Sequence, residues 1–395
     1  MVRVTVLVTL VFCLAGPQGF SQVADSVPQV DIVELIIKKF NINLKGKSRD
    51  NRKVHFSLFP TESAVPGGGR AVVTSFNAAF YLGEKSDTRV STVYFVPYIT
   101  LVGKYGFLVR PSIWLSRNSW NLNGDYRILK YPQYTWGVEG VSDNTVKTVV
   151  DYSYLRIYQT AIKTITTNWG LGIGYMLDYH DGISEEIPEG TEGHLASYFP
   201  GEQSRTTSAG FVFPIAYDSR LNAINPERGS FLLINYRFNT PLIGSDHQWQ
   251  SLYVDGRKYF PFSKHKHNLL ALRGYYWTVL SGQVPYLDLP SIGWDITLNP
   301  SGRGIQQGRY RSNALLYFES EYRVDLTHNG LFGAVVFTNV TSASVYDTQK
   351  FQSWHPAVGT GLRVKFNKYS RTNVALDFAF SKDYTTVYLR IGEAF

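Results

Sequence analysis

The segment from Ser301 to Asn313, SGRGIQQGRYRSN, combines three arginines with three glycines and holds no carboxylate. Guanidinium groups bind carboxylates and phosphates through paired hydrogen bonds, and glycine lets a backbone bend tightly. Three interpretations compete: a solvated loop, an anion-binding site, or a loop tucked into a polar cavity. The choice depends on the elements that would position the segment.

Residues typical of catalysis or metal binding are few and scattered. His265 and His267 could hold a metal, but a polar turn suits the local composition better. Glu185, Glu186 and Glu189 could bind calcium, although a solvated acidic loop is the commoner case. No Ser–His pair stands out as the nucleophile and base of a membrane-embedded lipase. We therefore expect no catalytic residue, no metal site and no cofactor.

The first 22 residues have the layout of a signal peptide, with Arg3, an apolar run from Val4 to Ala15, and then small and polar residues. The run is shorter than the ~18 apolar residues of a membrane helix. Cys13 is the only cysteine, so a disulfide-stapled secreted domain is excluded. The net charge of +8 comes without a dense basic run, so we expect no nucleic-acid partner. The excess positive charge would instead bind lipopolysaccharide or anionic lipid, or set the electrostatic field inside the protein.

Long segments of alternating polarity fill the rest of the chain. Between Ser312 and Leu326 one alternate set is mostly apolar and the other becomes increasingly ionic, ending Glu319, Glu321, Arg323 and Asp325. Successive side chains of a strand point to opposite faces, so these strands are oily on one face only. Their length of ~9–14 residues exceeds that of most globular strands and is enough to span a bilayer when tilted.

This alternation predicts an all-β fold, a transmembrane β-barrel of sixteen antiparallel strands, and an even number suits a bacterial barrel. Pro97, Pro111 and Pro214 fall inside strands, where we expect a bulge at each. The expected strands are 54–59, 71–82, 90–101, 104–115, 120–129, 147–160, 166–179, 207–217, 230–240, 248–260, 267–280, 312–325, 331–339, 356–366, 372–380 and 384–395.

The connections offer an independent test of the barrel. If the first strand starts in the periplasm, the outward connections include 130–146, 180–206, 281–311 and 340–355, which are the longest in the chain. Of the inward connections, only 218–229 exceeds a short turn. Outer-membrane barrels place long loops outside and short turns in the periplasm, so the pattern favours a barrel.

The chain ends in a strand-like segment that closes on an aromatic residue. Val387, Leu389, Ile391 and Phe395 are expected to share one face. This arrangement is similar to the C-terminal signal that outer-membrane barrels present to their assembly machinery.

The C-terminal half, roughly 207–395, resembles the barrel of the BamA/TamA superfamily, the bacterial surface antigens. The likeness depends on the order and spacing of short motifs. These are the turn residues Asp218, Arg220, Asn222, Pro226 and Gly229, the loop residues Arg303, Gly304, Ile305, Gly308 and Arg311, the strand segments 333–337, 359–363 and 373–378, and the closing segment 391–395.

The resemblance implies that the loop with Arg303 folds back into the lumen, where its arginine meets carboxylates of the inner wall. Asp377 is the first expected partner, and Glu319 and Glu321 face the same lumen. Asn339 stands where the family often has an aspartate, so it is expected to accept a hydrogen bond. Ile305 stands where the family usually has an aromatic residue. The alternative is a solvated outer loop whose arginines contact lipopolysaccharide.

The chain divides into three expected parts. We expect a signal peptide (1–22), an N-terminal helix and linker (23–53) and an outer-membrane barrel (54–395). Asp31–Phe40 is amphipathic and could plug the lumen, lie on the membrane surface or pack against the periplasmic rim. Family members that insert or secrete proteins carry periplasmic POTRA domains, and the interval before the first strand does not fit one.

The expected function is an accessory role in outer-membrane protein assembly or export in a Gram-negative bacterium. Expected partners are outer-membrane lipid, lipopolysaccharide, the barrel assembly machinery, and a partner barrel, periplasmic factor or second copy of the chain. A passive pore, a structural surface antigen and, last, a barrel lipase are the alternatives.

Overall fold

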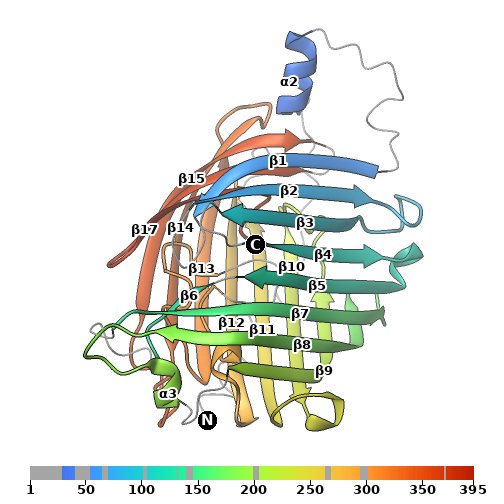
Figure 1. Cartoon of the computed structure of the whole chain (residues 1–395). Coiled ribbons are helices and arrows are strands. Elements are labelled where there is room, and N and C mark those ends of the chain that lie inside the picture. Colours follow the sequence, from blue (N-terminus) through green and yellow to red (C-terminus); the bar gives the residue numbers. More distant parts are fainter. Residues whose placement is uncertain are drawn as a thin grey trace.

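The computed structural model describes residues 29–40, 54–64, 70–100, 105–130, 132–138, 146–198, 204–262, 268–293, 301–368 and 371–395, and all structural statements concern these residues. Their strands form one sheet that curls into a barrel (Figure 1). The expected signal peptide lies outside the described residues. In the described part of the chain, no helix is long and apolar enough to cross a membrane.

The strands are long and follow one another closely along the chain. In order they are β1 Val54–Ala64, β2 Arg70–Phe80, β3 Ser91–Thr100, β4 Tyr105–Trp114, β5 Trp120–Lys130, β6 Gln133–Thr135, β7 Thr148–Thr164, β8 Trp169–Glu186, β9 Arg205–Asp218, β10 Gly229–Asn239, β11 Trp249–Pro261, β12 Leu269–Gly282, β13 Ala314–Asp325, β14 Phe332–Ala343, β15 His355–Asn367, β16 Thr372–Ser381 and β17 Thr385–Ile391. The helical segments are α2 Ile32–Lys39, α3 His194–Tyr198, η2 Ser116–Asn118, η3 Pro241–Ile243 and η4 Tyr286–Asp288.

Consecutive strands pair in antiparallel register from β1 to β17. Both β5 and β6 pair with β7, one after the other along its length. They are therefore two parts of one interrupted strand, and the wall has sixteen strand positions. The predicted sixteen-stranded antiparallel barrel is confirmed, as is the short N-terminal helix.

The three prolines correct the expectation of bulges. Ladders run through Pro97, Pro111 and Pro214 without a shift of register, and the recorded shifts lie elsewhere. Each proline pairs with one neighbouring strand, whereas its ladder to the other neighbour is interrupted beside it. Proline has no N–H to donate, so a gap on one side accommodates it without an extra residue.

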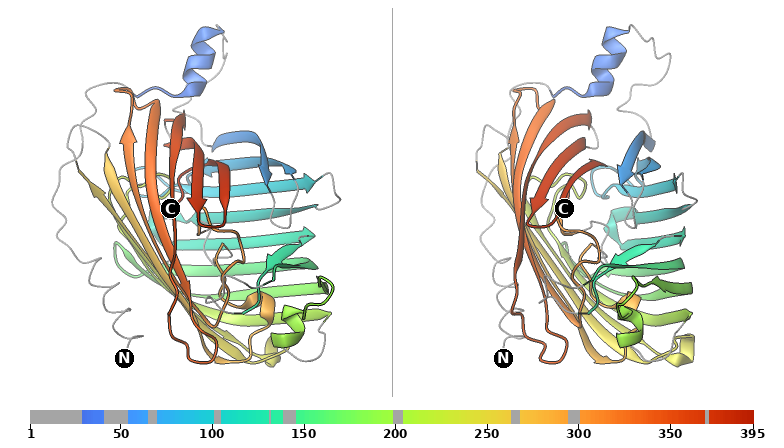
Figure 2. Two further views of the ribbon diagram at one scale, coloured as in Figure 1. Left: turned by 90° about the vertical axis from the view of Figure 1, so that its left-hand side faces the viewer. Right: turned by 60° about the vertical axis from the view of Figure 1, so that its left-hand side comes forward.

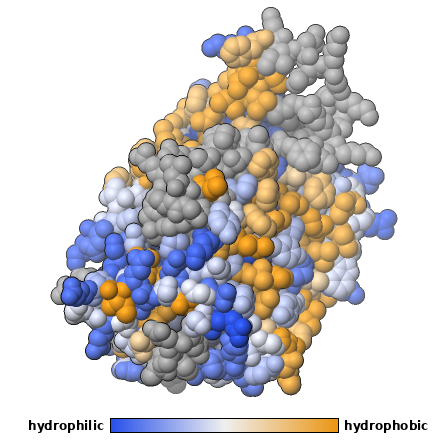
Figure 3. All heavy atoms as spheres, in the orientation of Figure 1, coloured by the Kyte–Doolittle hydropathy of each residue, from blue (hydrophilic) through white to orange (hydrophobic). Residues whose placement is uncertain are grey.

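The wall is apolar outside and polar inside. On β15, Val358 and Leu362 point outward and are more than half exposed, whereas Arg363 points inward and is buried. Figure 3 shows apolar side chains gathered over α2 and across the strands on the right of the view. This alternation is what a barrel in a bilayer with a polar lumen requires.

The two rims of the barrel differ. The turn rim carries the connections β2–β3, β4–β5, β7–β8, β9–β10, β11–β12, β13–β14 and β15–β16. The loop rim carries the longest connections, β6–β7, β8–β9, β12–β13 and β14–β15. We call residues 283–313 of the β12–β13 connection the lumen loop, because its described part runs inside the barrel (Figure 2).

Candidate functional site

Arg303 lies inside the barrel at the centre of three carboxylates. Its Nη2 is 2.5 Å from Glu319 Oε1 and 2.5 Å from Glu321 Oε2, and its Nη1 is 3.0 Å from Asp377 Oδ2. β13 supplies both glutamates and β16 supplies the aspartate. The structure thus brings the lumen-loop arginine to all three expected acceptors, with the glutamates closer than Asp377.

Burial alone would lower the pKa of Arg303, but the charges of Glu319, Glu321 and Asp377 outweigh it and raise the pKa well above its usual value. The guanidinium also stacks on the ring of Phe337, 3.5 Å from its centroid. A charged, planar group with carboxylates around it and an aromatic ring against it is fixed in one position.

Asn339 contacts the loop differently from the expectation. Its amide Nδ2 donates to the Arg303 carbonyl oxygen at 2.8 Å, so it binds the backbone as a donor instead of accepting from the guanidinium. On the same turn, the Gly304 N–H donates to the hydroxyl of Tyr388 on β17 at 3.2 Å. The backbone around Arg303 is therefore held on both sides.

Two glycines of the loop occupy positions that other residues would strain. Gly304 has φ +85°, and a Cβ there would lie 3.1 Å from Ala357 Cβ and 3.1 Å from the Phe380 nitrogen. Gly308 has φ +76°, and a Cβ there would lie 2.6 Å from Gln133 Nε2. Both permit a left-handed turn at a point where the loop touches the wall.

The remaining motif residues of the loop are buried. Ile305 joins an apolar cluster inside the barrel that includes Tyr253, Ile292 and Tyr310. Arg311 is fully buried, and its Nη1 donates to the Tyr286 carbonyl oxygen at 2.5 Å. The five motif residues therefore hold a loop inside the lumen, and Arg303 alone of them meets a carboxylate cluster.

The C-terminal segment corrects one expectation. Strand β17 ends at Ile391, and the chain turns inward at Gly392, which has φ +90°. Phe395 is buried against Tyr259 and its neighbours on β11 and β12, so it does not share the outer face of Val387 (Figure 1). Val387 is half-exposed on the outer face, while Leu389 and Ile391 are partly covered.

Glu393 anchors this inward turn. Its Oε2 accepts from Arg363 Nε at 2.8 Å, and its Oε1 accepts from Asn373 Nδ2 at 2.7 Å. Burial would raise the pKa of Glu393, but Arg363 and Arg323 outweigh that effect and lower it below its usual value. After Ile391 the chain therefore leaves the sheet, and Glu393 makes a charged contact within the lumen instead.

The turn motif lies between β9 and β10. Asp218 Oδ1 accepts from the N–H and the Nε of Arg220, at 3.0 and 2.9 Å. Asn222 Oδ1 accepts from the backbone N–H groups of residues 224 and 225. Pro226 is buried in the same turn. Gly229 has φ +101°, and a Cβ there would lie 2.6 Å from the carbonyl oxygen of residue 219. These contacts shape a turn.

Helix α2 packs against the turn rim. Asp31 caps it, because its Oδ1 accepts from the Glu34 N–H at 2.8 Å. The other oxygen of Asp31 accepts from the Lys368 N–H at 3.0 Å, and Lys368 Nζ is 2.7 Å from Glu34 Oε2. Of the three placements open to the helix, the structure shows packing against the rim.

Charged side chains of the lumen fall into two groups. The first, which we call the balanced cluster, contains four cations and four carboxylates. Its members are Arg303, Arg323, Arg363, Arg390, Glu319, Glu321, Asp377 and Glu393. Each arginine has a carboxylate within 3.1 Å, so the cluster neutralises itself.

The second group lies on β3–β12 and their turns, and we call it the surplus wall. Each of four aspartates is shared by two or more arginines. Its members are Asp125, Asp178, Asp218 and Asp255 with Arg89, Arg110, Arg127, Arg156, Arg220, Arg237, Arg257 and Arg273. In the ion pairs of the described residues, these eight arginines therefore share four aspartates.

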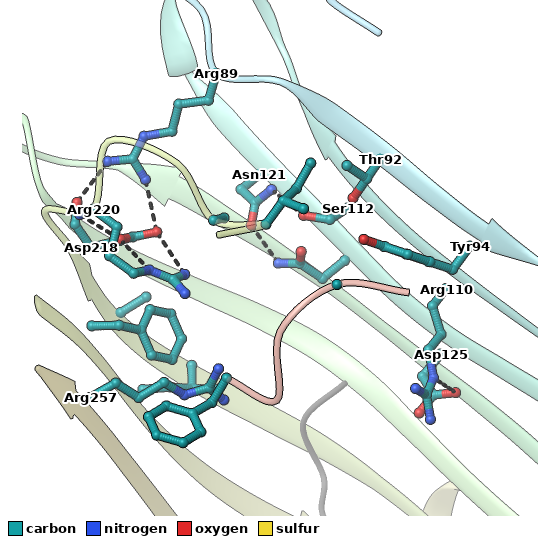
Figure 4. A pocket seen from close by; sticks show the side chains of 18 of the residues that line it. Arg89, Thr92, Tyr94, Arg110, Ser112, Asn121, Asp125, Asp218, Arg220 and Arg257 are labelled. Atoms are coloured by element: carbon teal, nitrogen blue, oxygen red, sulfur yellow. Dashed lines mark hydrogen bonds and ion pairs between the residues drawn. The ribbon is translucent and has the colours of Figure 1, made fainter. Parts of the chain in front are cut away.

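A cavity of about 600 Å³ lies against the surplus wall. We call it the vestibule. Its lining includes turn residues from the β2–β3, β4–β5, β7–β8 and β9–β10 connections, so it opens at the turn rim. Its inner end is formed by Ser301 and Arg303 of the lumen loop and by residues 388–395. Figure 4 shows Arg89, Arg110 and Arg257 spread around it.

Comparison with known proteins identifies the family. The family described as Omp85 superfamily domain matches residues 74–395, which is most of the chain. The chain belongs to the Omp85 superfamily. The predicted resemblance to BamA/TamA barrels and the outer-membrane location are thereby confirmed. Omp85 barrels are non-enzymatic transport and assembly proteins, in agreement with the expectation that this chain is not an enzyme.

Two solved structures show the same fold. BamA from Haemophilus ducreyi lacking POTRA domains 1-3 is 13% identical with a TM-score of 0.52, and the match covers 86% of this Omp85 chain and 69% of that one. CdiB from Acinetobacter baumannii is 12% identical with a TM-score of 0.54, covering 86% and 60%. The chain thus spans less than two thirds of the length of the CdiB chain. No curated protein matches.

Sequence reasoning did not find the surplus wall of this Omp85 barrel. A signal was present, because Arg110, Asp125, Arg156, Arg237 and Arg257 all lie on the lumen-facing parity of their strands. A count of charges on that parity from β4 to β12, strand by strand, would have shown more arginines than aspartates.

Asp288 of η4 is a further carboxylate beside the surplus wall. Its Oδ2 accepts from the Ser208 hydroxyl at 2.6 Å. Burial, helped by the nearby charge of Asp178, raises the pKa of Asp288 to about 7. This group therefore changes charge near neutral pH.

Proposed function

We propose that this Omp85 barrel is an accessory in outer-membrane protein assembly or export and that it acts with a partner. The match covers 69% of the BamA chain and 60% of the CdiB chain. In this proposal the partner, another barrel or a periplasmic factor, delivers the substrate to the barrel.

The observation that carries the proposal is the seam between the first and last strands. β16 and β17 pair over seven residues, from Val374 with Ile391 to Phe380 with Thr385, whereas β11 and β12 pair over thirteen. Among the described residues, the recorded ladders of β1 and β17 lead only to β2 and β16. The joint between β1 and β17 has no such ladder among the described residues, so it opens at less cost than the laddered joints of the wall.

An open pore is supported less well. The lumen loop and the inward C-terminal segment both occupy the barrel interior, and the balanced cluster fixes them there. We expect purified protein in planar bilayers to show no steady open conductance, and a stable large conductance would favour the pore.

The first experiment compares outer membranes from cells with and without this protein by quantitative mass spectrometry. If the protein assists assembly or export, at least one other barrel or exported protein falls by half or more, and the wild-type gene restores it. Affinity purification of tagged protein from mildly solubilised membranes should then recover a partner at near-equal amount. Unchanged membrane composition would exclude the accessory role.

The second experiment tests the seam itself. Cysteine pairs are scanned with one partner among residues 56–60 of β1 and the other at Val387 or Leu389 of β17. A disulfide there should abolish complementation, and reducing agent should restore it. The matched control joins β9 to β10 through Ile215→Cys and Ile234→Cys, which face each other in the ladder. If the seam disulfide forms and complementation persists, the seam does not open.

A further inference from the structure

The contacts that hold α2 to the barrel lie at the beginning of the helix. The Val30 N–H donates to the Asn329 carbonyl oxygen at 3.2 Å in the β13–β14 turn. Asp31 and Glu34 both contact Lys368 in the β15–β16 connection, at 3.0 and 2.7 Å. No residue of α2 itself is buried. The rim therefore fixes where the helix starts and leaves much of its surface uncovered.

The uncovered surface of α2 is apolar. Leu35, Ile36 and Phe40, the last of which caps the helix, are 40%, 44% and 68% exposed. Ile36 and Phe40 are four residues apart, so they lie on the same side of the helix. A helix of a soluble protein turns its apolar stripe toward the core, whereas α2 turns Glu34 toward the barrel (Figure 3). The exposed side chains therefore call for an apolar medium other than the barrel.

Two lysines stand at the same end of the helix. Lys38 and Lys39 occupy its last turn and are exposed. Neither side chain forms a hydrogen bond or ion pair with a described residue. A lysine lays its aliphatic stem along an apolar surface while its ammonium group stays in a polar layer. A helix that joins an apolar face to exposed lysines has the composition of a segment that lies at a membrane surface.

The lipid-facing wall of the barrel begins where α2 is attached. Leu326 and Phe332 flank the β13–β14 turn that holds Val30, and they are 59% and 45% exposed. On β13, Phe318 and Tyr322 precede Leu326 on the outward-facing parity and are exposed as well. Helix α2 thus starts at the edge of the surface that the bilayer covers.

We propose that α2 is a membrane-surface anchor that binds glycerophospholipids of the periplasmic leaflet. Leu35, Ile36 and Phe40 enter the layer between headgroups and acyl chains. Lys38 and Lys39 pair with the lipid phosphates. Outer-membrane barrels place short turns in the periplasm, so the turn rim that carries α2 faces the inner leaflet, which consists of glycerophospholipids. Lipopolysaccharide belongs to the leaflet at the opposite rim.

Other occupants of the apolar face fit less well. A helix that plugged the lumen would line its cavity, yet none of residues 29–40 lines the vestibule. A stable protein interface takes about 20–30 residues on each side, whereas this face offers three exposed apolar side chains. The proposal is separate from the assembly role, because it concerns the purified barrel in lipid without any partner.

A fluorescent label on α2 tests the proposal in the full-length barrel in phospholipid nanodiscs. Cys13, the only native cysteine, is replaced by alanine, and Ile36→Cys carries an environment-sensitive nitrobenzoxadiazole group. Lipids with a doxyl quencher on the acyl chain should quench this label by about half or more. Iodide, which stays in water, should quench it at least threefold less than it quenches a label exposed to water.

Two further label positions calibrate the measurement. Ser86→Cys lies in the β2–β3 connection on the same rim and is exposed, so iodide should quench its label and doxyl lipid should not. Val358→Cys lies on the outer face of β15, where Val358 is 54% exposed, so its label should respond to doxyl lipid and not to iodide.

Two results would overturn the proposal. A label at residue 36 that behaves like the label at residue 86 would show that the apolar face of α2 stands in water. Protection from iodide without quenching by doxyl lipid would show that protein covers this face, either a second copy of the chain or another part of the same chain.

Apolar variants assign the side chains that enter the lipid. With the label kept at residue 36, Leu35→Ser together with Phe40→Ser should reduce quenching by doxyl lipid at least twofold. Heat-modifiable gel migration checks that each variant is folded. If the double variant does not fold, the two substitutions are measured singly, each with an expected reduction of about a quarter or more. Wild-type quenching in the folded variants would contradict the anchor.

Charge variants test the lipid phosphates. Addition of about 30% phosphatidylglycerol to phosphatidylcholine nanodiscs should strengthen doxyl quenching of the label on α2, because basic segments bind anionic surfaces. Lys38→Gln together with Lys39→Gln should remove this gain. The matched control is Lys85→Gln with Lys382→Gln, which removes the same charge from exposed positions of the same rim and should keep the gain. A gain that persists without Lys38 and Lys39, or that vanishes in the control, would overturn the pairing of these lysines with phosphate.

Discussion

The two sides of the lumen use the same residue type for different ends. In the balanced cluster, four arginines from the lumen loop, β13, β15 and β17 meet four carboxylates from β13, β16 and the C-terminal segment. On the surplus wall, eight arginines share four aspartates, and a cavity lies in front of them. One side is filled by its own chain, and the other is open.

The difference separates two kinds of arginine in the lumen. An arginine whose removal leaves a carboxylate without a cation is structural, because an unpaired buried charge is costly. An arginine that shares an already neutralised aspartate contributes little to stability, so its presence needs another explanation. The variants below test this distinction, starting with the largest expected effect.

Arg303→Ala should cause the largest loss of stability. Glu321 keeps Arg323 and Asp377 keeps Arg363, but Glu319 keeps only the hydroxyl of Tyr317. We expect a loss of about 3–5 kcal/mol in the free energy of unfolding. Urea titration in lipid vesicles, followed by gel mobility, measures it.

Removal of the stranded carboxylate should recover part of that loss. The double variant Arg303→Ala with Glu319→Gln has no unpaired charge at that point, so it should be more stable than Arg303→Ala alone. If the free energy of unfolding of Arg303→Ala lies within about 1 kcal/mol of the wild-type value, the lumen loop is not held by this cluster.

Gly304→Ala tests the backbone at the same site and should have a smaller effect. Gly304 has φ +85°, and its new Cβ would press on the Phe380 nitrogen and on Ala357 at 3.1 Å. We expect a loss of about 1–3 kcal/mol from strain and crowding together. Gly190→Ala is the matched control, since Gly190 has φ +79° with nothing within 4 Å of the new Cβ.

The difference between the two glycine variants measures the close approach to the wall alone. Equal losses would mean that Gly304 is required for its backbone angle and that the loop does not press on the wall. The same urea titration serves for both variants.

How much of this could be predicted from the sequence depends on the range of the interaction. Alternation of polarity along a strand is local, so the sequence sufficed for the strands and for the lumen-facing side of Glu319 and Glu321. The Arg303 motif located the loop through its resemblance to a family. The resemblance also named the carboxylates that Arg303 meets. Neither source predicts which arginines share the aspartates of β4–β12, because that depends on how the sheet closes.

The corrections have the same origin. The sequence predicts Phe395 as one more residue of a lipid-facing strand. In the structure Gly392 turns the chain inward, and Arg363 on β15 holds Glu393 there. The sequence predicts a bulge at Pro214, whereas in the structure a gap in the ladder between β9 and β8 accommodates it. In both cases a tertiary contact or a neighbouring strand selects between conformations that the local sequence permits.

Asp288 tests the surplus wall through pH. Because burial and Asp178 raise its pKa to about 7, its contribution to stability is complete below the usual aspartate pKa and is lost as pH rises through 7. Between pH 5 and pH 8, the wild type should lose about 1 kcal/mol or more relative to Asp288→Asn. Urea midpoints at several pH values measure this, and parallel curves for the two proteins would contradict it.

The smallest stability effect is expected for Arg110→Gln, and it separates the two kinds of arginine most sharply. Arg127 holds Asp125 at 2.5 Å, whereas Arg110 lies 3.5 Å away. Removing Arg110 leaves Asp125 neutralised and relieves repulsion between arginines, so the free energy of unfolding should change by less than about 1 kcal/mol. Arg127→Gln, the matched control on the same aspartate, should cost about 2–3 kcal/mol. Equal losses would show that both arginines stabilise the fold to the same extent.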